Sequence, residues 1–345
     1  MTRVLTELEL DYSDVLLLPS RSKLHSRSEV DLNRTFNFKA GGNPWTGIPI
    51  IAANMDGVAT FDMVKAFDQY HMLVALNKHY STEELIKFWS ENDTTNVFYS
   101  IGINDADFAK FKAVSKAVGK IDKVCIDAAN FYTKAALTFL KGFVDSFPNT
   151  TVLVGNVVSG NIVEELILSG ASIVKTGIGP SRVCETRSKT GVGRPQFSAI
   201  LDCANAAHGL DGFICADGGL TGPGDFAKSY GAGSDFTMAG SIFSGCNEGG
   251  GEVVDGKVKF WGMSSNTAME LHTGQSVLDY RASEGRTVWV NYKGSVHTVI
   301  KEVLGGLRSS GTYIGAENIK NFPKCATFTK VNRPIDNSWE RNSAI

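Results

Sequence analysis

Cys184 lies in the middle of a loop, residues 177–193, that begins and ends with glycine. Cationic side chains stand on both sides of it in the sequence, namely Arg182, Arg187, Lys189 and Arg194. A thiol becomes a nucleophile when nearby cations and backbone N–H groups favour its thiolate, and this loop offers both. We therefore interpret Cys184 as a candidate nucleophile rather than as an inert, buried thiol.

Two glycine-containing turns could bind the phosphate and ribose of a nucleotide. They are Asp217-Gly218-Gly219 and Gly240-Ser241, and each directly follows an apolar stretch. Such turns are common singly, but at the ends of the last two strands of a barrel they bind phosphate through backbone N–H groups. Asp217 would then accept hydrogen bonds from ribose hydroxyls. A nucleophile, a phosphate site and a ribose site together predict a nucleotide substrate.

A third chemical element is the sequence Tyr-Arg-Ala-Ser-Glu-Gly at 280–285. Charged pairs in loops usually lie on the surface. If this loop instead folds over the other two elements, Glu284 could move protons and Arg281 could pair with an anion. The role of the segment therefore depends on where the chain places it.

The elements that must position these groups alternate along the chain. Short β-branched stretches predict strands, and stretches with apolar residues at three- and four-residue spacing predict helices between them. This pattern is typical of an α/β fold, a (β/α)8 TIM barrel, with Cys184 and both glycine turns at the carboxyl ends of its last three strands. The eight predicted strands are 49–55, 72–77, 97–103, 123–127, 151–157, 172–177, 212–216 and 235–239. The predicted helices include 82–92, 107–118, 133–147, 161–170 and 196–209.

Two regions lie outside this alternation. Residues 1–48 are interpreted as an N-terminal extension, and residues 246–295 as an insertion after the eighth strand that is too long for a simple connection. Within the insertion, 257–263 and 287–294 have the character of strands. Because long loops at the carboxyl face of a barrel carry its chemistry, we expect the insertion to act as a flap. We take 1–345 as one barrel domain.

The composition argues against several classes of protein. The 345 residues carry a net charge of −2 and no basic runs, so neither a nucleic-acid nor a membrane surface is expected. The six cysteines form no CxxC pair and have no histidines at metal-binding spacing, which argues against a zinc site and disulfides. The N-terminal residues lack the apolar stretch of a signal peptide. We expect a soluble, cytoplasmic protein.

Nearly the whole chain resembles the IMP dehydrogenase/GMP reductase family, in particular its short members, the GMP reductases. The resemblance is carried by SRSEVDL (26–32), IIAANMD (50–56), KHYS (78–81), VGNVVSG (154–160), TGVGRPQ (190–196), WGMSS (261–265), YRASEG (280–285) and LGGLRSSGTYIGA (304–316). It implies NADPH-dependent reductive deamination of GMP to IMP and ammonia, a step of purine metabolism. By the same resemblance, Cys184 adds to the purine C2 and forms a covalent thioimidate. Thr186 and Glu284 would carry the proton transfers.

The resemblance also assigns binding residues. Those for GMP are Asp217, Gly218, Gly219, Gly240, Ser241, Gly262, Met263, Ser264, Arg281, Ala282, Ser283 and Gly285. Those for NADPH are Lys78, Asp127, Ala128, Ala129, Ile178, Gly179, Met263, Tyr280 and Arg281. A further group reaches the NADPH of a neighbouring subunit in the family and implies a homotetramer: Ser26, Arg27, Ser309, Ser310, Gly311 and Thr312. A potassium site would include Gly179, Ser181, Cys184 and Arg187.

The chain departs from the family pattern beside the nucleophile. Ser181-Arg182 stands where the family has Gly-Ser, in a loop whose carbonyl groups bind potassium in the family. Arg182 could hydrogen-bond these carbonyl groups and partly replace the ion, or it could point to solvent. We favour the first alternative, which predicts a weaker dependence on potassium. Other departures are at Gly57, Asn77, Phe131, Glu185 and Ser241.

Three other functions remain open. Oxidation of IMP would use the same covalent intermediate, but no regulatory domain interrupts the barrel and the expected Arg-Tyr pair before RASEG is absent. A nucleotide-binding protein that has lost catalysis would more often have lost Cys184, Thr186 or Glu284. A flavin-binding barrel is a third alternative on fold alone, and a colourless protein would argue against it.

Overall fold

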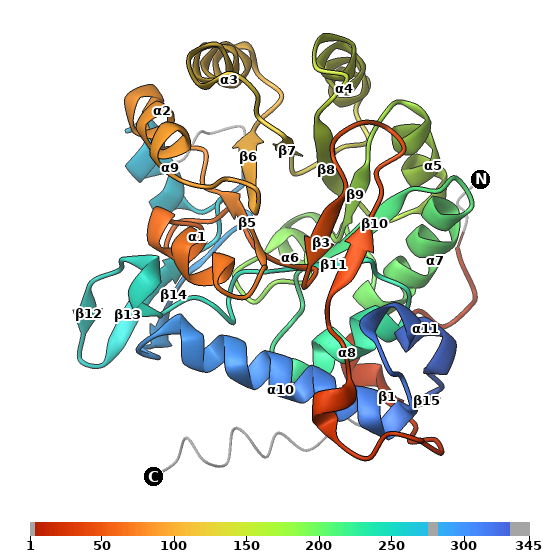
Figure 1. The fold of residues 1–345 in the computed structure, drawn as a ribbon. Helices are drawn as coiled ribbons and strands as arrows, with labels where there is room; N and C mark the ends of the chain where they lie inside the picture. The colour runs from red at the N-terminus through yellow and green to blue at the C-terminus, as the bar shows by residue number, and fades with distance from the viewer. Residues whose placement is uncertain (1–3, 275–281, 332–345) are drawn as a thin grey trace.

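The computed structural model describes residues 4–274 and 282–331. Eight parallel strands close into a barrel in the order β10-β11-β4-β5-β6-β7-β8-β9. Figure 1 shows the helices arranged around them. All eight predicted strands are confirmed: β4 (Ile50–Ala52), β5 (Leu73–Leu76), β6 (Val97–Ile101), β7 (Lys123–Asp127), β8 (Thr151–Val157), β9 (Ile173–Thr176), β10 (Phe213–Asp217) and β11 (Phe236–Ala239).

The surrounding helices bury one apolar face each against the barrel. Many begin at a side-chain cap: Ser81 and Glu84, for example, cap each other's backbone N–H groups at the start of α2. The five helices named from the sequence are confirmed. The helices of the barrel are α1 (Phe61–Asp68), α2 (Thr82–Glu91), α3 (Asp105–Val118), α4 (Lys134–Ser146), α5 (Gly160–Leu168), α7 (Gln196–His208), α8 (Pro223–Gly231) and α10 (Val296–Ile314).

An N-terminal hairpin closes one end of the barrel. It consists of β2 (Arg34–Phe36) and β3 (Trp45–Gly47), which pair antiparallel. Phe36 is fully buried and stacks on Phe236, the first residue of β11, with 4.2 Å between ring centroids. The region interpreted as an extension is thus more than that, because its hairpin plugs the amino end of the barrel. A ligand must approach from the carboxyl ends of the strands.

The described part of the insertion after β11, residues 246–274 and 282–295, contains a small antiparallel sheet and one α-helix. The sheet contains β12 (Val253–Val254), β13 (Lys257–Trp261) and β14 (Thr287–Asn291), and the helix is α9 (Asn266–Thr273). The two strand-like stretches of the sequence correspond to β13 and β14, whereas α9 was not predicted. In Figure 1 the sheet lies to one side of the barrel, beside α1.

Two short strands near the ends of the described chain pair with each other outside the barrel sheet. Strand β1 (Val15–Leu17) runs antiparallel to β15 (Phe328–Lys330), which follows α11 (Phe322–Cys325). Between residues 4 and 274 and between 282 and 331, no helix has the length and apolar character needed to cross a bilayer.

Candidate active site

A cavity of about 500 Å³ opens at the carboxyl ends of the barrel strands. It brings the three chemical elements of the sequence together, with the Cys184 loop, the end of β10 and the returning chain of the insertion in its wall. The predicted residues that line it are Lys78, Asp127, Ala128, Ala129, Ile178, Gly179, Ser181, Cys184, Thr186, Asp217, Gly218, Gly262, Met263, Ser264, Glu284 and Gly285. The volume is ordinary for a small-molecule site.

Cys184, Thr186 and Glu284 form a continuous hydrogen-bonded chain at this cavity. The sulfur of Cys184 lies 3.2 Å from Oγ1 of Thr186, and Thr186 donates its hydroxyl hydrogen to Oε2 of Glu284 at 2.7 Å. Because that hydroxyl has one hydrogen and gives it to the carboxylate, its lone pairs are free to accept the thiol hydrogen. The arrangement can pass a proton between sulfur and carboxylate.

Backbone pairing holds Glu284 beside the nucleophile. The amide of Glu185 donates to the Glu284 carbonyl at 2.6 Å, and the amide of Arg286 donates to the Val183 carbonyl at 3.0 Å. A side chain at Gly262 would prevent this approach, since a Cβ atom there would lie 2.7 Å from the Val183 carbonyl oxygen. Of the 280–285 segment, Glu284 thus lies beside Cys184 and Thr186, and its role in proton transfer stays a prediction. Tyr280 and Arg281 lie outside the described residues.

The cations of the loop have partners other than the thiol. Nη1 of Arg187 contacts Asp11 at 2.9 Å, and the guanidinium of Arg194 makes two bonds to Glu9 at 2.8 and 2.9 Å. The side chains of Arg182 and Lys189 are exposed. That the loop cations favour the Cys184 thiolate stays a prediction, and the hydrogen-bonded chain to Glu284 offers a second route to a thiolate.

Two carbonyl groups of the loop in which the potassium site was predicted already accept hydrogen bonds. The Ser181 carbonyl already accepts the Cys184 amide at 3.1 Å, and Nε of Arg187 donates to the Ile178 carbonyl at 3.3 Å. The side chain of Arg187 also packs against Gly179, where a Cβ atom would lie 2.4 Å from it. Arg187, and not the exposed Arg182, thus hydrogen-bonds a carbonyl group of the loop.

Asp217 lies at the cavity in the position expected for a ribose contact. Its Oδ2 accepts a hydrogen bond from Nδ2 of Asn156 at 2.9 Å and lies 3.3 Å from Nζ of Lys175. Neither Asn156 nor Lys175 was singled out in the sequence, although both lie within family motifs. Further lining residues that the sequence did not reveal are Asn54, Met55, His79, Met269, His272 and Thr273.

The glycine turns adjoin this cavity. Gly218 and Gly219 have φ of 87° and 77°, values that glycine adopts without strain. Gly240 packs so closely on Met55, a lining residue, that a Cβ atom would lie 2.6 Å from its sulfur. Some predicted GMP residues do not line the cavity as described: Gly219, Gly240, Ser241, Ala282 and Ser283.

The residues that the resemblance assigns to a neighbouring subunit do not line the cavity of their own chain. Ser26 caps the short 3-10 helix Arg27–Glu29, while Ser309 and Ser310 lie on α10. Gly311 packs on Val30, since a Cβ atom there would lie 2.8 Å from the valine side chain. The groups around 26–27 and 309–312 thus approach each other on the surface.

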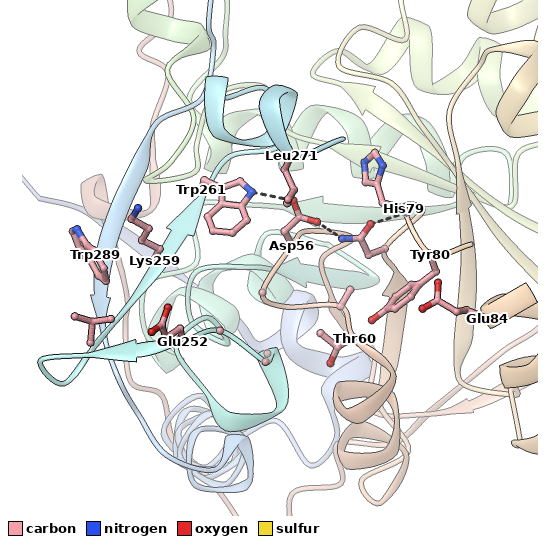
Figure 2. Close-up of a pocket in the computed structure, with 17 residues that line it drawn as sticks. Asp56, Thr60, His79, Tyr80, Glu84, Glu252, Lys259, Trp261, Leu271 and Trp289 are labelled. Atoms are coloured by element: carbon pink, nitrogen blue, oxygen red, sulfur yellow. Dashed lines mark hydrogen bonds between the residues drawn. The ribbon is translucent and has the colours of Figure 1, made fainter. Parts of the chain in front are cut away.

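A second cavity, of about 750 Å³, adjoins the first and shares His79 with it. Figure 2 shows Asp56 near its centre, with its carboxylate accepting a hydrogen bond from Trp261. The same carboxylate accepts a hydrogen bond from Nδ2 of Asn77. Asp56 also accepts from Nε2 of His272 at 2.7 Å, and His272 stacks on His79 with 3.4 Å between ring centroids. This network ties α9 to the barrel. This second cavity was not predicted from the sequence.

A closed (β/α)8 barrel with a thiol, a hydroxyl and a carboxylate in line at its carboxyl face is the architecture of a barrel enzyme. Comparison with known proteins identifies its kind. Residues 9–335 match the family model described as the IMP dehydrogenase / GMP reductase domain. The chain therefore belongs to the IMP dehydrogenase/GMP reductase family.

Relatives match over nearly their whole length. GMP reductase 1 of Homo sapiens is 50% identical over 337 residues, which cover 96% of this chain and 97% of that protein. GMP reductase of Aliivibrio salmonicida is 48% identical over 344 residues, which cover 98% and 99%. GMP reductase of Vibrio cholerae is 47% identical over 346 residues, with the same two shares of 98% and 99%.

Proposed function

We propose that the protein is a GMP reductase that converts GMP and NADPH to IMP, ammonia and NADP⁺. The observation that carries the proposal is the hydrogen-bonded chain from Cys184 through Thr186 to Glu284. The names of the relatives, which match across nearly the whole chain, support the same reaction. The proposed domain is the whole chain, with 246–295 as its flap.

GMP would bind with its sugar at Asp217 and its phosphate at the two glycine turns. The carboxylate of Asp217 is 21% exposed, and its contacts with Asn156 and Lys175 fix its orientation. Backbone N–H groups at Gly218-Gly219 and Gly240-Ser241 suit a phosphate, because glycine lets the backbone approach it closely. The base would then lie between Cys184 and residues 262–264.

Deamination begins when Cys184 loses its proton through Thr186 to Glu284. The sulfur forms a bond to C2 of the purine, and the C2–N bond to the exocyclic amine breaks. The amine must be protonated to leave as ammonia, and the same two side chains can return the proton. The product is a thioimidate between Cys184 and C2.

Reduction then replaces sulfur by hydrogen at C2. NADPH, when bound, supplies a hydride to C2 together with its electron pair. The C–S bond breaks, its electrons return to Cys184, and IMP is released. GMP, NADPH and two protons thus give IMP, NADP⁺ and an ammonium ion.

The residues at one side of the cavity fit the polar part of a nicotinamide nucleotide. The carboxylate of Asp127 is 35% exposed there, and the backbone of 127–129 borders the same space. Lys78 lies nearby and pairs with Asp107 at 2.9 Å. The groups at 26–27 and 309–312 would complete this site from a neighbouring subunit of a homotetramer. We assign potassium no part in the reaction.

The decisive experiment follows NADPH absorbance after GMP is added to the purified protein. We expect NADPH to be consumed and IMP and ammonia to form in equal amounts, with no turnover in Cys184→Ala. Production of NADH from IMP and NAD⁺ instead would identify an oxidising enzyme. GMP binding without turnover under any of these conditions would identify a binding protein.

A further inference from the structure

Lys175 is a buried cation in the floor of the Cys184 cavity to which the proposed reaction assigns no step. Its side chain is 3% exposed. Its ammonium group contacts the carboxylate of Asp127 and lies 3.3 Å from Oδ2 of Asp217. On the proposed function these two carboxylates face different ligands, since Asp127 faces the cofactor and Asp217 faces the ribose of GMP.

The register of the strands explains how one lysine reaches both carboxylates. The side chains two positions before Lys175, Asp127 and Asp217 pack inside the barrel. Because side chains alternate along a strand, these three side chains also point inward. Strand β8 lies between β7 and β9, and its residue in register with Lys175 is Gly155, which also pairs with Asp127. A Cβ atom at Gly155 would lie 2.4 Å from that of Lys175. Glycine at this position therefore lets the lysine cross β8.

The charges of this group depend on one another. Burial alone would lower the pKa of Lys175, but the carboxylates of Asp127 and Asp217 outweigh it and hold the pKa well above its ordinary value. Burial likewise tends to raise the pKa of Asp127, and the ammonium of Lys175 reverses this, so that the pKa is lowered. Without Lys175, two inward carboxylates would share the cavity floor with no cation between them.

We infer that Lys175 is a positioning residue that fixes Asp127 and Asp217 relative to each other and thereby couples the binding of NADPH to that of GMP. The identity of the two ligands rests on the proposed function. A ligand that orders one carboxylate also orders the ammonium group, and through it the other carboxylate. Each nucleotide thus prepares the site for the other, which is a coupling between two binding sites.

The test compares Lys175→Met with Lys175→Arg and with a control, Lys123→Met. Lys123 is a buried lysine at the opposite end of β7, far from the cavity, so its loss reports the general effect of removing such a side chain. Calorimetry gives the Kd of GMP with and without saturating NADP⁺, a pair that cannot react. In the wild type we expect NADP⁺ to tighten GMP binding by a factor in the range of about 5–150.

The coupling factor should fall toward one in Lys175→Met, persist in part in Lys175→Arg and remain unchanged in Lys123→Met. In Lys175→Met the acid limb of the NADP⁺ affinity profile should also move to higher pH, because Asp127 loses the cation that lowers its pKa. Turnover should fall by about 10²-fold, as expected for a displaced substrate. Weaker affinities with an unchanged coupling factor would overturn the inference.

Two further comparisons keep the test decisive. If Lys175→Met does not fold, Asp127→Asn takes its place: it should weaken GMP binding without any cofactor, and its effect should not add to that of Asp217→Asn. Additive effects would overturn the inference. A wild type that binds both nucleotides with coupling but consumes no NADPH would overturn the proposed function alone. Turnover in the wild type with full coupling in Lys175→Met would overturn the inference alone.

Discussion

The carboxylate of Asp11 accepts a hydrogen bond from the guanidinium of Arg187 at 2.9 Å, across 176 positions of the sequence. Its other oxygen accepts the backbone N–H of Gln196 at 2.5 Å. Arg187 follows Cys184 by three residues, and Gln196 begins α7. One side chain of the N-terminal segment therefore holds both ends of the chain that runs from Arg187 to the start of α7.

This contact predicts that Asp11→Asn lowers activity through a residue that touches no ligand. The amide keeps the shape but loses the charge. Because both side chains are 34% exposed, we expect the free energy of unfolding to change by no more than about 1 kcal/mol. Turnover should fall more than stability suggests, since the Cys184 loop is displaced. Steady-state kinetics and thermal melts measure the two effects. Asp31→Asn, at an exposed aspartate with a local partner, should change neither.

Glu284 should govern the rate and not the affinity. Glu284→Gln keeps a hydrogen-bond acceptor for Thr186 but cannot take its proton, so kcat should fall by about 10²–10⁴-fold while the Kd of GMP stays the same. Glu185→Gln is a matched control, because it removes the carboxylate of the residue next to Cys184 and leaves in place the Glu284 carboxylate to which Thr186 donates. A change confined to the KM of GMP would make Glu284 a binding residue.

The barrel was predictable because each unit repeats a local pattern. Strands such as Leu73–Leu76 are continuous apolar stretches, and helices such as Thr82–Glu91 have both an apolar face and a capping box. Helix α9 escaped prediction because it is short, buries only Ala268, and lies within a glycine-rich, charged insertion. The plug formed by Phe36 could not be predicted, since its partners are far away in the sequence.

In the candidate site, too, local features could be predicted and contacts between distant segments could not. Cys184 and Thr186 lie two residues apart in the sequence, so their chemistry could be predicted. The salt bridge of Arg187 with Asp11 could not be predicted, because a contact between distant segments leaves no local signal. The sequence gives a weak signal for Lys175, because alternation along β9 places it inward, where a charged side chain needs a partner.

Arg182 should have no part in any response to potassium. Its side chain is exposed, whereas Arg187 donates to a carbonyl group of the loop. We therefore expect Arg182→Ser to show the same activity as the wild type at every potassium concentration, tested against a bulky organic cation at constant ionic strength. Potassium dependence that appears only in Arg182→Ser would restore the hypothesis that this arginine replaces the ion.

His208 should make stability depend on pH. Its hydrogen bond to the buried carboxylate of Asp235, at 2.8 Å, raises the pKa of His208 above its ordinary value. Because the folded state binds the proton more tightly, this contribution is complete below about pH 6.5, the usual pKa of histidine, and is lost as the pH rises through the raised value. The melting temperature of the wild type should fall over this range more steeply than that of His208→Gln. His25→Gln, at an exposed histidine, should follow the wild type.

A cofactor site shared between subunits, as we propose, predicts that two inactive variants restore activity when they assemble together. Lys78 lines the cavity of its own chain, whereas Ser310 lies on α10 and does not. If each site takes Lys78 from one subunit and Ser310 from its neighbour, some sites in a mixed oligomer of Lys78→Met and Ser310→Tyr contain neither substitution. Random mixing in a symmetric assembly should restore about a quarter of the wild-type sites.

The control for this experiment mixes Lys78→Met with Cys184→Ala. Both residues line the same cavity in one chain, so every site of the mixed oligomer contains one substitution and no activity should return. The two chains are refolded or co-expressed with different affinity tags, and only the doubly tagged oligomers are assayed for loss of NADPH. Absence of activity in the doubly tagged oligomers of Lys78→Met and Ser310→Tyr would contradict a shared site. Equal activity in the Ser310→Tyr mixture and in the Cys184→Ala mixture would place Ser310 outside the cofactor site.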